Sequence, residues 1–386
     1  MRQGRAARPG ASQEVGRVLC VGTDPDLRAD LLAACAEAGA VADAVPHRPA
    51  SQAWAGAALV LVGSAEAHLV QDLPRRDGVV LVHHEPRGGD DDPGAEVWRA
   101  AVQAGAQQVL VLPLARDWLV EAARRAARPK GSCVAVVGAR GGAGATTTAV
   151  ALATAGAVAG LRVLLVDADP LGGGLDLAVG AEQLPGLRWA DLADVAGPLP
   201  PGGLGAALPV ADGVTVLSHG RDALRVAPAS ARAVLRAGAD EHDLVVLDLP
   251  RAGDPAAQVA VEAADVLLCV CPAEVRAAAA VPAVLTGWPG PHRTHLLVRG
   301  PSPGGLRPRD AARAVETGLL AVGAAGGGTD ARARRVERVD VVRAEPGLAG
   351  ALERGEPFAV AARSPLRRWA AGWVEAHLPV DARAAA

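Results

Sequence analysis

The amino-acid sequence predicts an α/β protein built from two units, each with a mostly parallel sheet covered by helices. Three observations lead to this class. Short apolar runs of strand length alternate with alanine-rich stretches of helix length. A glycine-rich turn joins one apolar run to a helix within residues 134–148. Acidic residues end two later apolar runs, at the position where the strands of open α/β sheets meet their ligands.

Length and composition agree with a two-domain globular protein. The chain has 386 residues, of which 50% are hydrophobic, enough for two cores and too many for a disordered chain. A formal net charge of −3 gives no general basic field, so charge does not favour DNA binding. The five cysteines are scattered, which suits reduced thiols in a cytoplasmic protein. Charges interrupt the long apolar stretches, so we expect neither a signal peptide nor a membrane-spanning helix.

The first unit is expected at residues 17–127, after a disordered tail at residues 1–16. Helix-like stretches such as Leu27–Ala38 and Trp98–Ala104 lie between apolar runs typical of buried strands. About five such alternations in roughly 110 residues predict a flavodoxin-like sheet. The strand-like runs are Val18–Val21, Leu59–Val62, Val79–Val82 and Val109–Leu112.

This pattern is also the outline of a phosphoacceptor receiver domain, but the reactive groups are missing. A receiver carries its acceptor aspartate at the end of the third strand, where this chain has Gly63-Ser64. The lysine before the proline that follows the fifth strand is replaced as well, by Leu112-Pro113. Asp24 and Asp26 keep the acidic character after the first strand. We therefore expect a pseudo-receiver that serves as a docking or targeting module.

The second unit is expected at residues 128–380, before a short tail at residues 381–386. Val134–Val137 is short and β-branched, as in a buried strand, whereas Ala149–Ala159 is long and alanine-rich enough for a helix. The turn between them is rich in glycine and includes Gly141, Gly142 and Gly144. Glycine permits positive φ and lets backbone N–H groups approach an anion at a helix N-terminus. The turn therefore has the outline of a phosphate-binding loop.

Two residues after these glycines define what this loop has and what it lacks. Thr146 is placed to offer its hydroxyl to a magnesium ion, as the Ser or Thr of a P-loop does. Ala145 stands where a P-loop carries its lysine. A charge-assisted hydrogen bond contributes roughly 1.5–3 kcal/mol, so its loss should weaken nucleotide binding by about one to two powers of ten. Hydrolysis should suffer more, because the missing cation neutralises charge that grows in the transition state.

Three carboxylates are expected near the loop. Arg162–Pro170 reads as a strand that ends in Asp167 and Asp169, and Leu244–Pro250 reads as another that ends in Asp248. One aspartate at a strand end can simply cap a helix. Three of them, together with the glycine turn, favour a site for a magnesium-bound nucleotide.

These residues resemble the MinD/ParA superfamily. Arg140–Thr147, which reads RGGAGATT, is similar to its deviant Walker A motif, with Arg140 at the signature-lysine position and Ala145 at the second lysine. Val166–Glu182 is similar to the segment that begins with the Walker A′ aspartate and continues through switch I. The resemblance implies that ATP and Mg²⁺ are bound by Gly141, Gly142, Ala143, Gly144, Ala145, Thr146, Thr147, Asp167 and Asp248, with the metal held by Thr146, Asp167 and Asp248 directly or through water.

The resemblance also implies catalytic roles and a branch of the superfamily. Asp169 would orient the attacking water, and Arg140 would reach across a nucleotide-dependent homodimer to the partner's phosphates. Val270–Ala280 resembles a late strand and helix of the family, and Leu352–Leu366 resembles its closing Gly-x-Pro element. The best match is the CpaE/TadZ branch with its actinobacterial septum-site-determining relatives. Those proteins pair a receiver-like domain with a MinD-like domain and often lack the P-loop lysine.

The C-terminal stretch Pro365–Leu378 reads as an amphipathic helix. MinD relatives use such a helix for peripheral contact with membranes. The alternative is a terminal helix packed against its own domain, which Gly372 and the neighbouring alanines favour. Its apolar positions are Leu366, Trp369, Trp373 and Leu378, with Arg363, Arg367 and Arg368 beside them.

Three functions are consistent with the sequence. The first is an ATP-binding spatial regulator with weak or absent hydrolysis, which determines a septum site or positions a Tad-type pilus or secretion apparatus. It would act in the cytoplasm or at the inner face of the membrane, at the septum or pole, and contact the division or secretion machinery through the pseudo-receiver. The second is a catalytically dead scaffold. The third is a ParA-like DNA-partitioning ATPase, which the absence of a basic stripe disfavours, so no specific nucleic acid is expected.

Overall fold

The structure is a computed structural model of the whole chain. It describes residues 16–76, 78–84, 93–127, 131–195, 202–221, 224–288, 292–302, 304–325, 336–345 and 364–378, with single residues 197, 199, 290, 347 and 350. The two tails expected at residues 1–16 and 381–386 lie outside the described residues, apart from Gly16, as does most of Leu352–Leu366.

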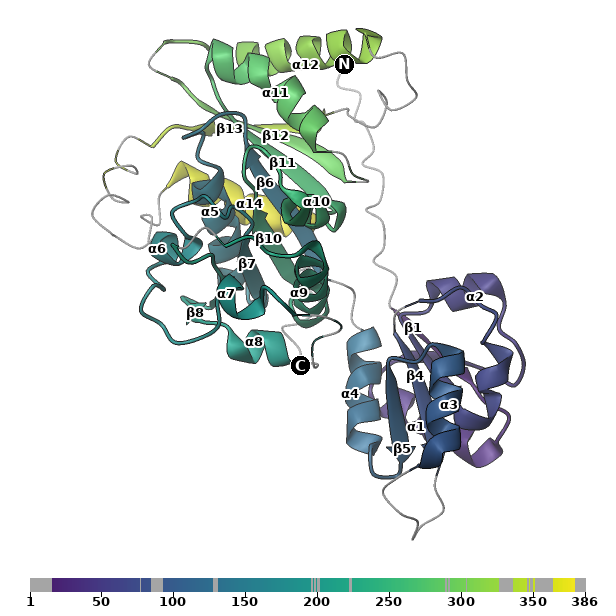
Figure 1. Ribbon diagram of the computed structural model, residues 1–386. Helices are drawn as coiled ribbons and strands as arrows, with labels where there is room; N and C mark the ends of the chain where they lie inside the picture. Colours follow the sequence, from purple (N-terminus) through teal and green to yellow (C-terminus); the bar gives the residue numbers. More distant parts are fainter. Residues whose placement is uncertain are drawn as a thin grey trace. The chain divides into compact units, whose positions relative to one another are not determined.

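The chain divides into two compact units, unit 1 at residues 1–130 and unit 2 at residues 131–386. Each is a layered α/β structure (Figure 1).

Unit 1 is a five-stranded parallel sheet in the order β2-β1-β3-β4-β5. This is the flavodoxin-like order, so the predicted fold of the first unit is confirmed. The strand β2 was not expected from the sequence, because it is an edge strand whose residues are half-buried or exposed. The strands are β1 (Arg17–Val21), β2 (Val41–Val45), β3 (Leu59–Gly63), β4 (Val79–His84) and β5 (Gln108–Leu112).

Successive side chains of a strand point to opposite sides of the sheet. Both sides are apolar here, and helices cover each of them. On β1, Cys20 packs into the core under α1 and α4, whereas Val21 packs into the core under α2 and α3. The helix α1 begins where the sequence provides a cap, since the Asp24 carboxylate accepts a hydrogen bond from the backbone N–H of Asp26 at 2.9 Å. The helices are α1 (Pro25–Glu37), α2 (Ser51–Gly56), the 3₁₀ helix η1 (Ser64–Leu69), α3 (Gly94–Ala104) and α4 (Arg116–Ala127).

Unit 2 is an eight-stranded sheet in the order β13-β12-β11-β6-β10-β7-β9-β8. Its strands are parallel except at the short β8, which pairs antiparallel with β9. This is the mostly parallel sheet that the sequence predicts. The strands are β6 (Ser132–Gly138), β7 (Val163–Asp167), β8 (Val210–Ala211), β9 (Val214–Leu217), β10 (Leu244–Asp248), β11 (Val266–Pro272), β12 (Arg293–Gly300) and β13 (Val336–Arg343).

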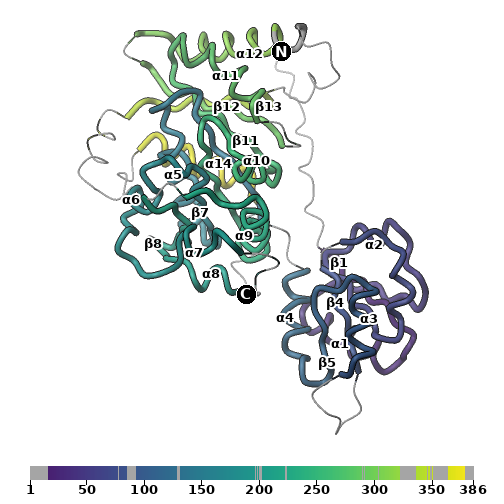
Figure 2. Tube along the Cα trace, in the orientation of Figure 1, coloured from purple at the N-terminus to yellow at the C-terminus, as the bar shows by residue number. Residues whose placement is uncertain are grey.

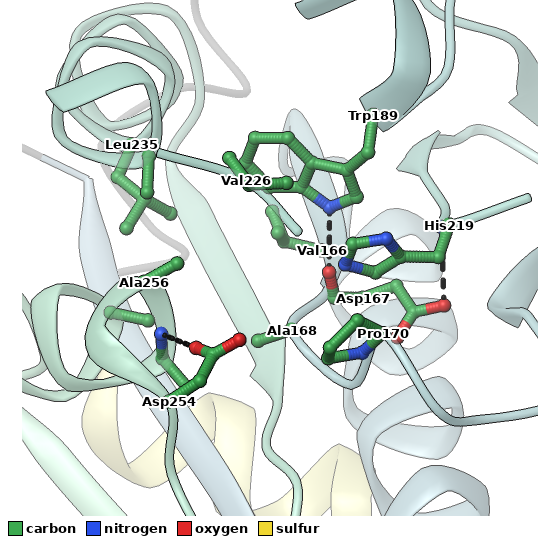
Figure 3. A pocket seen from close by; sticks show the side chains of 13 residues that line it. Val166, Asp167, Ala168, Pro170, Trp189, His219, Val226, Leu235, Asp254 and Ala256 are labelled. Carbon is green, nitrogen blue, oxygen red and sulfur yellow. Dashed lines mark hydrogen bonds between the residues drawn. The ribbon is translucent and has the colours of Figure 1, made fainter. Parts of the chain in front are cut away.

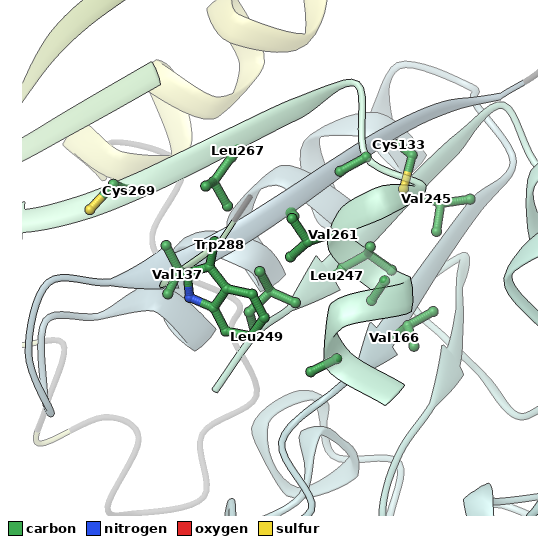
Figure 4. Close-up of a cluster of buried hydrophobic side chains, with 14 of the residues drawn as sticks. Cys133, Val137, Val166, Val245, Leu247, Leu249, Val261, Leu267, Cys269 and Trp288 are labelled. Carbon is green, nitrogen blue, oxygen red and sulfur yellow. The ribbon is translucent and has the colours of Figure 1, made fainter. Parts of the chain in front are cut away.

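Two hydrophobic cores lie on opposite faces of this sheet. One core contains Trp288, which lies near Val137, Leu249 and Leu267 (Figure 4). The path of the chain through both layers can be followed in Figure 2. Helices α7 (Trp189–Leu192), α8 (Gly203–Ala207), α9 (Pro228–Glu241), α10 (Pro255–Glu262), α11 (Val275–Gly287) and α12 (Pro308–Ala325) border this core. Helices α5 (Ala145–Val158), α6 (Leu175–Val179) and α14 (Pro365–His377) border the other.

The helix α5 is apolar on nearly all sides because it lies between the sheet and α14. Small residues let it approach the strands closely, and a Cβ added at Gly156 would come within 2.9 Å of the side chains of Val163 and Leu244. This position places the first turn of α5 at the carboxyl ends of β6 and β10. The alanine-rich sequence therefore serves to bring the glycine turn to the centre of the sheet.

The C-terminal helix α14 packs against its own domain. Leu366, Trp373 and Leu378 are 1%, 1% and 5% exposed and belong to the same core as α5. The half-buried Trp369 donates its indole N–H to the Asp340 carboxylate at 3.0 Å. Of the two alternatives for this segment, the packed helix is the one observed, since the apolar face that a membrane would require is already covered. No helix in the described part of the chain combines the length and apolar composition needed to cross a bilayer.

Candidate functional site

The glycine turn between β6 and α5 forms a cradle of backbone N–H groups. Gly142 and Gly144 have φ of +71° and +91°, which explains why glycine is required at these two positions. Ala143 is buried beneath the turn, and no side chain caps the N-terminus of α5 at Gly144. The first N–H groups of the helix therefore remain available, and the positive end of the helix dipole favours an anion there.

The three threonines after the turn differ in burial and in hydrogen-bond partners. Thr148 is fully buried and donates its hydroxyl to the Gly144 carbonyl at 2.7 Å, so it stabilises the turn itself. Thr146 is exposed and hydrogen-bonds the Asp248 carboxylate. Thr147 is half-exposed at the same end of the helix. The structure thus places Thr146 beside a carboxylate, as the predicted magnesium site requires.

Asp248 ends β10 directly beside the glycine turn. In the register of the sheet it pairs with Val136 of β6 on one side and with Asp167 of β7 on the other. Its side chain is buried, and this burial raises its pKa to about 7, with the charges of Asp167 and Asp169 adding to the shift. The Thr146 hydroxyl opposes the shift by hydrogen bonding to the charged form. A cation that binds beside this buried carboxylate would stabilise its ionised form.

The neighbouring Asp167 is largely satisfied by its own domain. Its carboxylate accepts backbone N–H groups from Asp169 and Leu175 at 3.1 Å each and from His219 at 3.3 Å. Burial raises the pKa of Asp167, and these hydrogen bonds oppose the shift. Its backbone carbonyl accepts the Trp189 indole N–H at 2.6 Å, as Figure 3 shows. Asp167 therefore fixes the start of the segment at residues 168–182.

Asp169 lies half-buried two residues beyond β7. One of its carboxylate oxygens accepts the backbone N–H of Leu171 at 3.0 Å. Together with Asp167 and Asp248 it forms the acidic edge that the sequence predicts, since its charge acts on Asp248. Its role in orienting an attacking water stays a prediction.

The donor set at this edge suits Mg²⁺ bound together with a phosphate. Within the described residues no three His, Cys, Asp or Glu side chains gather closely enough to hold a metal alone. Magnesium typically takes one or two carboxylates and completes its shell with water and substrate phosphates. The buried Asp248 and the Thr146 hydroxyl provide oxygen donors of this type, with Asp167 beside them. When bound, the ion would neutralise phosphate charge.

Arg140 forms an ion pair that the sequence did not reveal. Its guanidinium donates to both carboxylate oxygens of Glu274, at 2.8 and 2.7 Å, and to the Gly141 carbonyl at 2.6 Å. Glu274 follows β11, the strand next to β6 in the sheet. The pair raises the pKa of Arg140 and lowers that of Glu274. Both side chains remain about one-third exposed, at 38% and 32%.

A second arginine, Arg299, also reaches the glycine turn. It lies near the end of β12, and its guanidinium donates to the Ala143 carbonyl at 3.2 Å. Arg299 was not predicted from the sequence, because the strand β12 was itself not recognised. The signal was nevertheless present, since Arg299 follows the buried run Leu296–Val298 directly.

A small cavity lies on the other side of Asp167. Its volume is about 20 Å³, enough for a single water molecule. Trp189 and His219, whose rings stack with centroids 5.8 Å apart, line it together with residues of β7, α9 and α10 (Figure 3). No residue of the glycine turn lines this cavity, so it is separate from the phosphate-binding loop.

Comparison with known proteins shows two domain families in the chain. Residues 21–133 match the CheY-like N-terminal domain of Rv3660c-like proteins, and residues 134–200 match the CobQ/CobB/MinD/ParA nucleotide binding domain. The uncharacterized protein Rv3660c of Mycobacterium tuberculosis H37Rv is 40% identical over 348 residues, which cover 86% of this chain and 90% of the relative. The chain belongs to the Rv3660c-like family. The predicted pairing of a receiver-like and a MinD/ParA-like domain is confirmed for this family member.

Solved structures similar to this Rv3660c-like chain have low sequence identity. A ParA family ATPase from Chlorobium tepidum TLS matches with a TM-score of 0.51 at 14% identity, covering 64% of this chain and 98% of that one. The septum site-determining protein MinD of Pyrococcus horikoshii OT3, solved with Mg-ADP, matches with a TM-score of 0.49 at 19% identity, covering 64% and 95%. The first match agrees with the ParA-type fold of unit 2.

The CheY-like domain of this Rv3660c-like chain carries a carboxylate where a receiver has its acceptor, but on another residue. Glu66 is 2% exposed and accepts hydrogen bonds from both the backbone N–H and the hydroxyl of Thr23. A Cβ added at Gly63 would overlap the carboxylate of Glu66. Glu66 therefore fills the space of the missing acceptor side chain and ties η1 to the loop after β1. This role was not predicted, because Glu66 is 43 positions from Thr23 and the two meet only in the folded domain.

Restoring an aspartate at the end of β3 should therefore damage unit 1. Gly63→Asp would place a second carboxylate against Glu66 in a buried site, and we expect a loss of about 2–4 kcal/mol in the free energy of unfolding. Urea unfolding of unit 1 measures this. Gly56→Asp is the control, because no atom lies within 4 Å of its added Cβ. Gly63→Asp combined with Glu66→Ala should recover most of the loss, and an unchanged single variant would contradict the assignment of Glu66.

Proposed function

We propose that this Rv3660c-like protein is an ATP-binding spatial regulator of the MinD/ParA type. One observation carries the proposal, namely the convergence of an uncapped helix N-terminus at Gly144 with the buried Asp248 and its Thr146 partner. An anion and a divalent cation are the two groups that such an arrangement stabilises. Mg-ATP supplies both. Bound nucleotide would promote dimerisation, and the dimer would mark a septum site or position a Tad-type pilus or secretion apparatus.

The turnover of bound ATP should be slow. Ala145 offers no charge to the phosphates, and donors of this kind are worth about 10³ or more in rate in phosphoryl transfer. Binding depends less on the missing lysine, since backbone N–H groups and Mg²⁺ carry much of it. The protein would therefore hold its ATP-bound form for long periods, as a positional marker requires. The CheY-like domain, which has no acceptor aspartate at Gly63, would dock this marker onto division or secretion proteins at the inner face of the membrane.

The ion pair of Arg140 is compatible with a role across a dimer interface. Exposed ion pairs contribute about 0–1 kcal/mol, and the Arg140 side chain is 38% exposed. Opening the contact to Glu274 therefore costs little compared with a new bidentate contact to a partner's phosphates. In this account Glu274 holds Arg140 in the monomer and releases it in the dimer.

Two substitutions of this pair should have opposite effects on dimerisation. Sedimentation velocity of the full chain with a slowly hydrolysed ATP analogue and Mg²⁺ should show a dimer that is absent without nucleotide. Arg140→Ala should weaken the dimer about tenfold or more, because one charge-assisted contact is lost. Glu274→Gln should leave the dimer as strong or a few-fold stronger, because Arg140 is freed. Arg124→Ala, which removes an exposed pair in unit 1, is the control.

Equal weakening of the dimer by Arg140→Ala and Glu274→Gln would contradict this role and make the pair structural.

A nucleotide-independent scaffold is the second candidate, and the internal hydrogen bonds of Asp167 favour it. Asp169→Ala separates the two candidates in cells, since septum position and the localisation of a fluorescent fusion should change only for a nucleotide switch. A diffuse wild-type fusion in cells with normal septa would defeat the positioning role.

A further inference from the structure

The guanidinium of Arg299 lies against the phosphate-binding turn from a distant part of the chain. The strand β12 is separated from β6 only by β11, so the end of β12 faces the same edge of the sheet as the turn. Nη1 of Arg299 donates to the Ala143 carbonyl at 3.2 Å. A Cβ added at Gly144 would overlap the same guanidinium. The missing side chain of Gly144 is therefore the space that Arg299 occupies.

This arginine has fewer partners than its charge requires. Among the described residues no carboxylate lies within ion-pair distance of Arg299, and the Ala143 carbonyl is its acceptor. Its Nε is buried and has no hydrogen-bond partner there. Desolvation lowers the pKa of Arg299, although the charge of Glu345 opposes the shift. A guanidinium has five N–H donors, and leaving buried donors unpaired is costly.

The surroundings of Arg299 indicate what would pair with it. The N-terminus of α5 begins at Ala145, next to the glycine that Arg299 contacts, and carries the positive end of the helix dipole. Two positive groups side by side repel each other unless an anion lies between them. At this edge the anion that the proposed function supplies is the phosphate chain of ATP.

We propose that Arg299 is the cation of this P-loop. It binds the phosphate chain of the nucleotide in place of the lysine that a P-loop usually carries at the position of Ala145. The inference rests on the proposed function, because it assumes that the turn binds nucleotide. Arginine suits the task, since its planar fork matches two phosphate oxygens at once. The cation is thus supplied from β12 instead of from the first residue of α5.

Calorimetric titration of the full chain with a slowly hydrolysed ATP analogue and Mg²⁺ tests the proposal. Arg299→Ala should bind about 10- to 100-fold more weakly than wild type, and Arg299→Lys should lose less. Returning the lysine with Ala145→Lys in the Arg299→Ala background should recover most of the affinity. Arg293→Ala is the matched control, because Arg293 is exposed at the opposite end of the same strand. Unchanged affinity of Arg299→Ala would overturn the proposal.

Two further readouts exclude a merely structural role. Without nucleotide, Arg299→Ala should be at least as stable to heat as wild type, because it removes a partly buried charge that has no ion-pair partner among the described residues. A lower melting temperature, together with equal affinity losses for ATP, ADP and AMP, would make Arg299 structural. If wild type binds inorganic tripolyphosphate through Arg299 but does not bind the ATP analogue, the proposed function fails, and Arg299 is supported only as a phosphate-binding residue of the turn. If the analogue binds independently of Arg299, the inference alone fails.

Discussion

Asp248→Asn should stabilise unit 2 in the absence of Mg²⁺, by about 2–4 kcal/mol at pH 8. The pKa of Asp248 is raised from 3.8 to about 7 in the folded protein, and a difference of one pKa unit corresponds to about 1.4 kcal/mol. At pH 8 the folded protein must hold this carboxylate ionised although it is buried. Asparagine has nearly the same shape and no charge, so the cost disappears. Urea unfolding in EDTA measures the difference.

The pH dependence of stability gives the same residue a second signature. Because the folded state binds the Asp248 proton more tightly than the unfolded chain, its contribution is complete below about pH 4 and is lost as the pH rises to about 7. Asp248→Asn should remove this loss, so its advantage should grow from pH 4 to pH 7. The control Asp212→Asn changes an exposed turn residue with φ of +48°, where asparagine is also tolerated. A less stable Asp248→Asn at pH 8 would contradict the account.

Trp373→Ala should destabilise unit 2 by about 3–5 kcal/mol, because it removes a large side chain that is 1% exposed between α14 and the sheet. The indole stacks on His377 with ring centroids 4.2 Å apart, so the helix also loses an internal contact. Since α14 covers α5, the glycine turn should become less ordered as well. Urea unfolding followed by circular dichroism measures the first effect.

The matched control for this helix is Trp98→Ala, because Trp98 is 54% exposed in unit 1. It should change stability by no more than about 0.5 kcal/mol. If Trp373→Ala were equally harmless and instead released the protein from vesicles, α14 would be a membrane helix and its packing against α5 would be contradicted.

The fold could be predicted where single segments carry the information. Buried strands such as β6, β7 and β10 are continuous apolar runs, and they were recognised together with the helix α5. The edge strands β2 and β13 were missed, because nearly all their residues are exposed or half-buried and they carry charges such as Asp43 and Glu337. An edge strand forms by pairing with the adjacent strand, and the sequence of the segment alone does not show which strand that is.

The candidate site was predictable to the same extent. Asp167, Asp169 and Asp248 were found because strand ends of a parallel sheet converge by geometry. Arg299 and Glu274 also lie near strand ends, but neither was predicted, because Arg299 lies in a strand that was not recognised and Glu274 stands two residues beyond the end of β11. That Arg140 pairs with Glu274 could not be predicted, because the two residues are 134 positions apart and meet only through the order of the strands.

The most direct test of the central claim is equilibrium binding of Mg-ATP to the wild-type protein. Because Ala145 replaces the P-loop lysine, we expect saturable binding of one nucleotide per chain with a dissociation constant of about 1–100 µM. Binding should fall sharply in EDTA and in Asp248→Ala, because the metal joins the phosphates to that carboxylate. Absence of saturable binding at millimolar Mg-ATP would contradict the account.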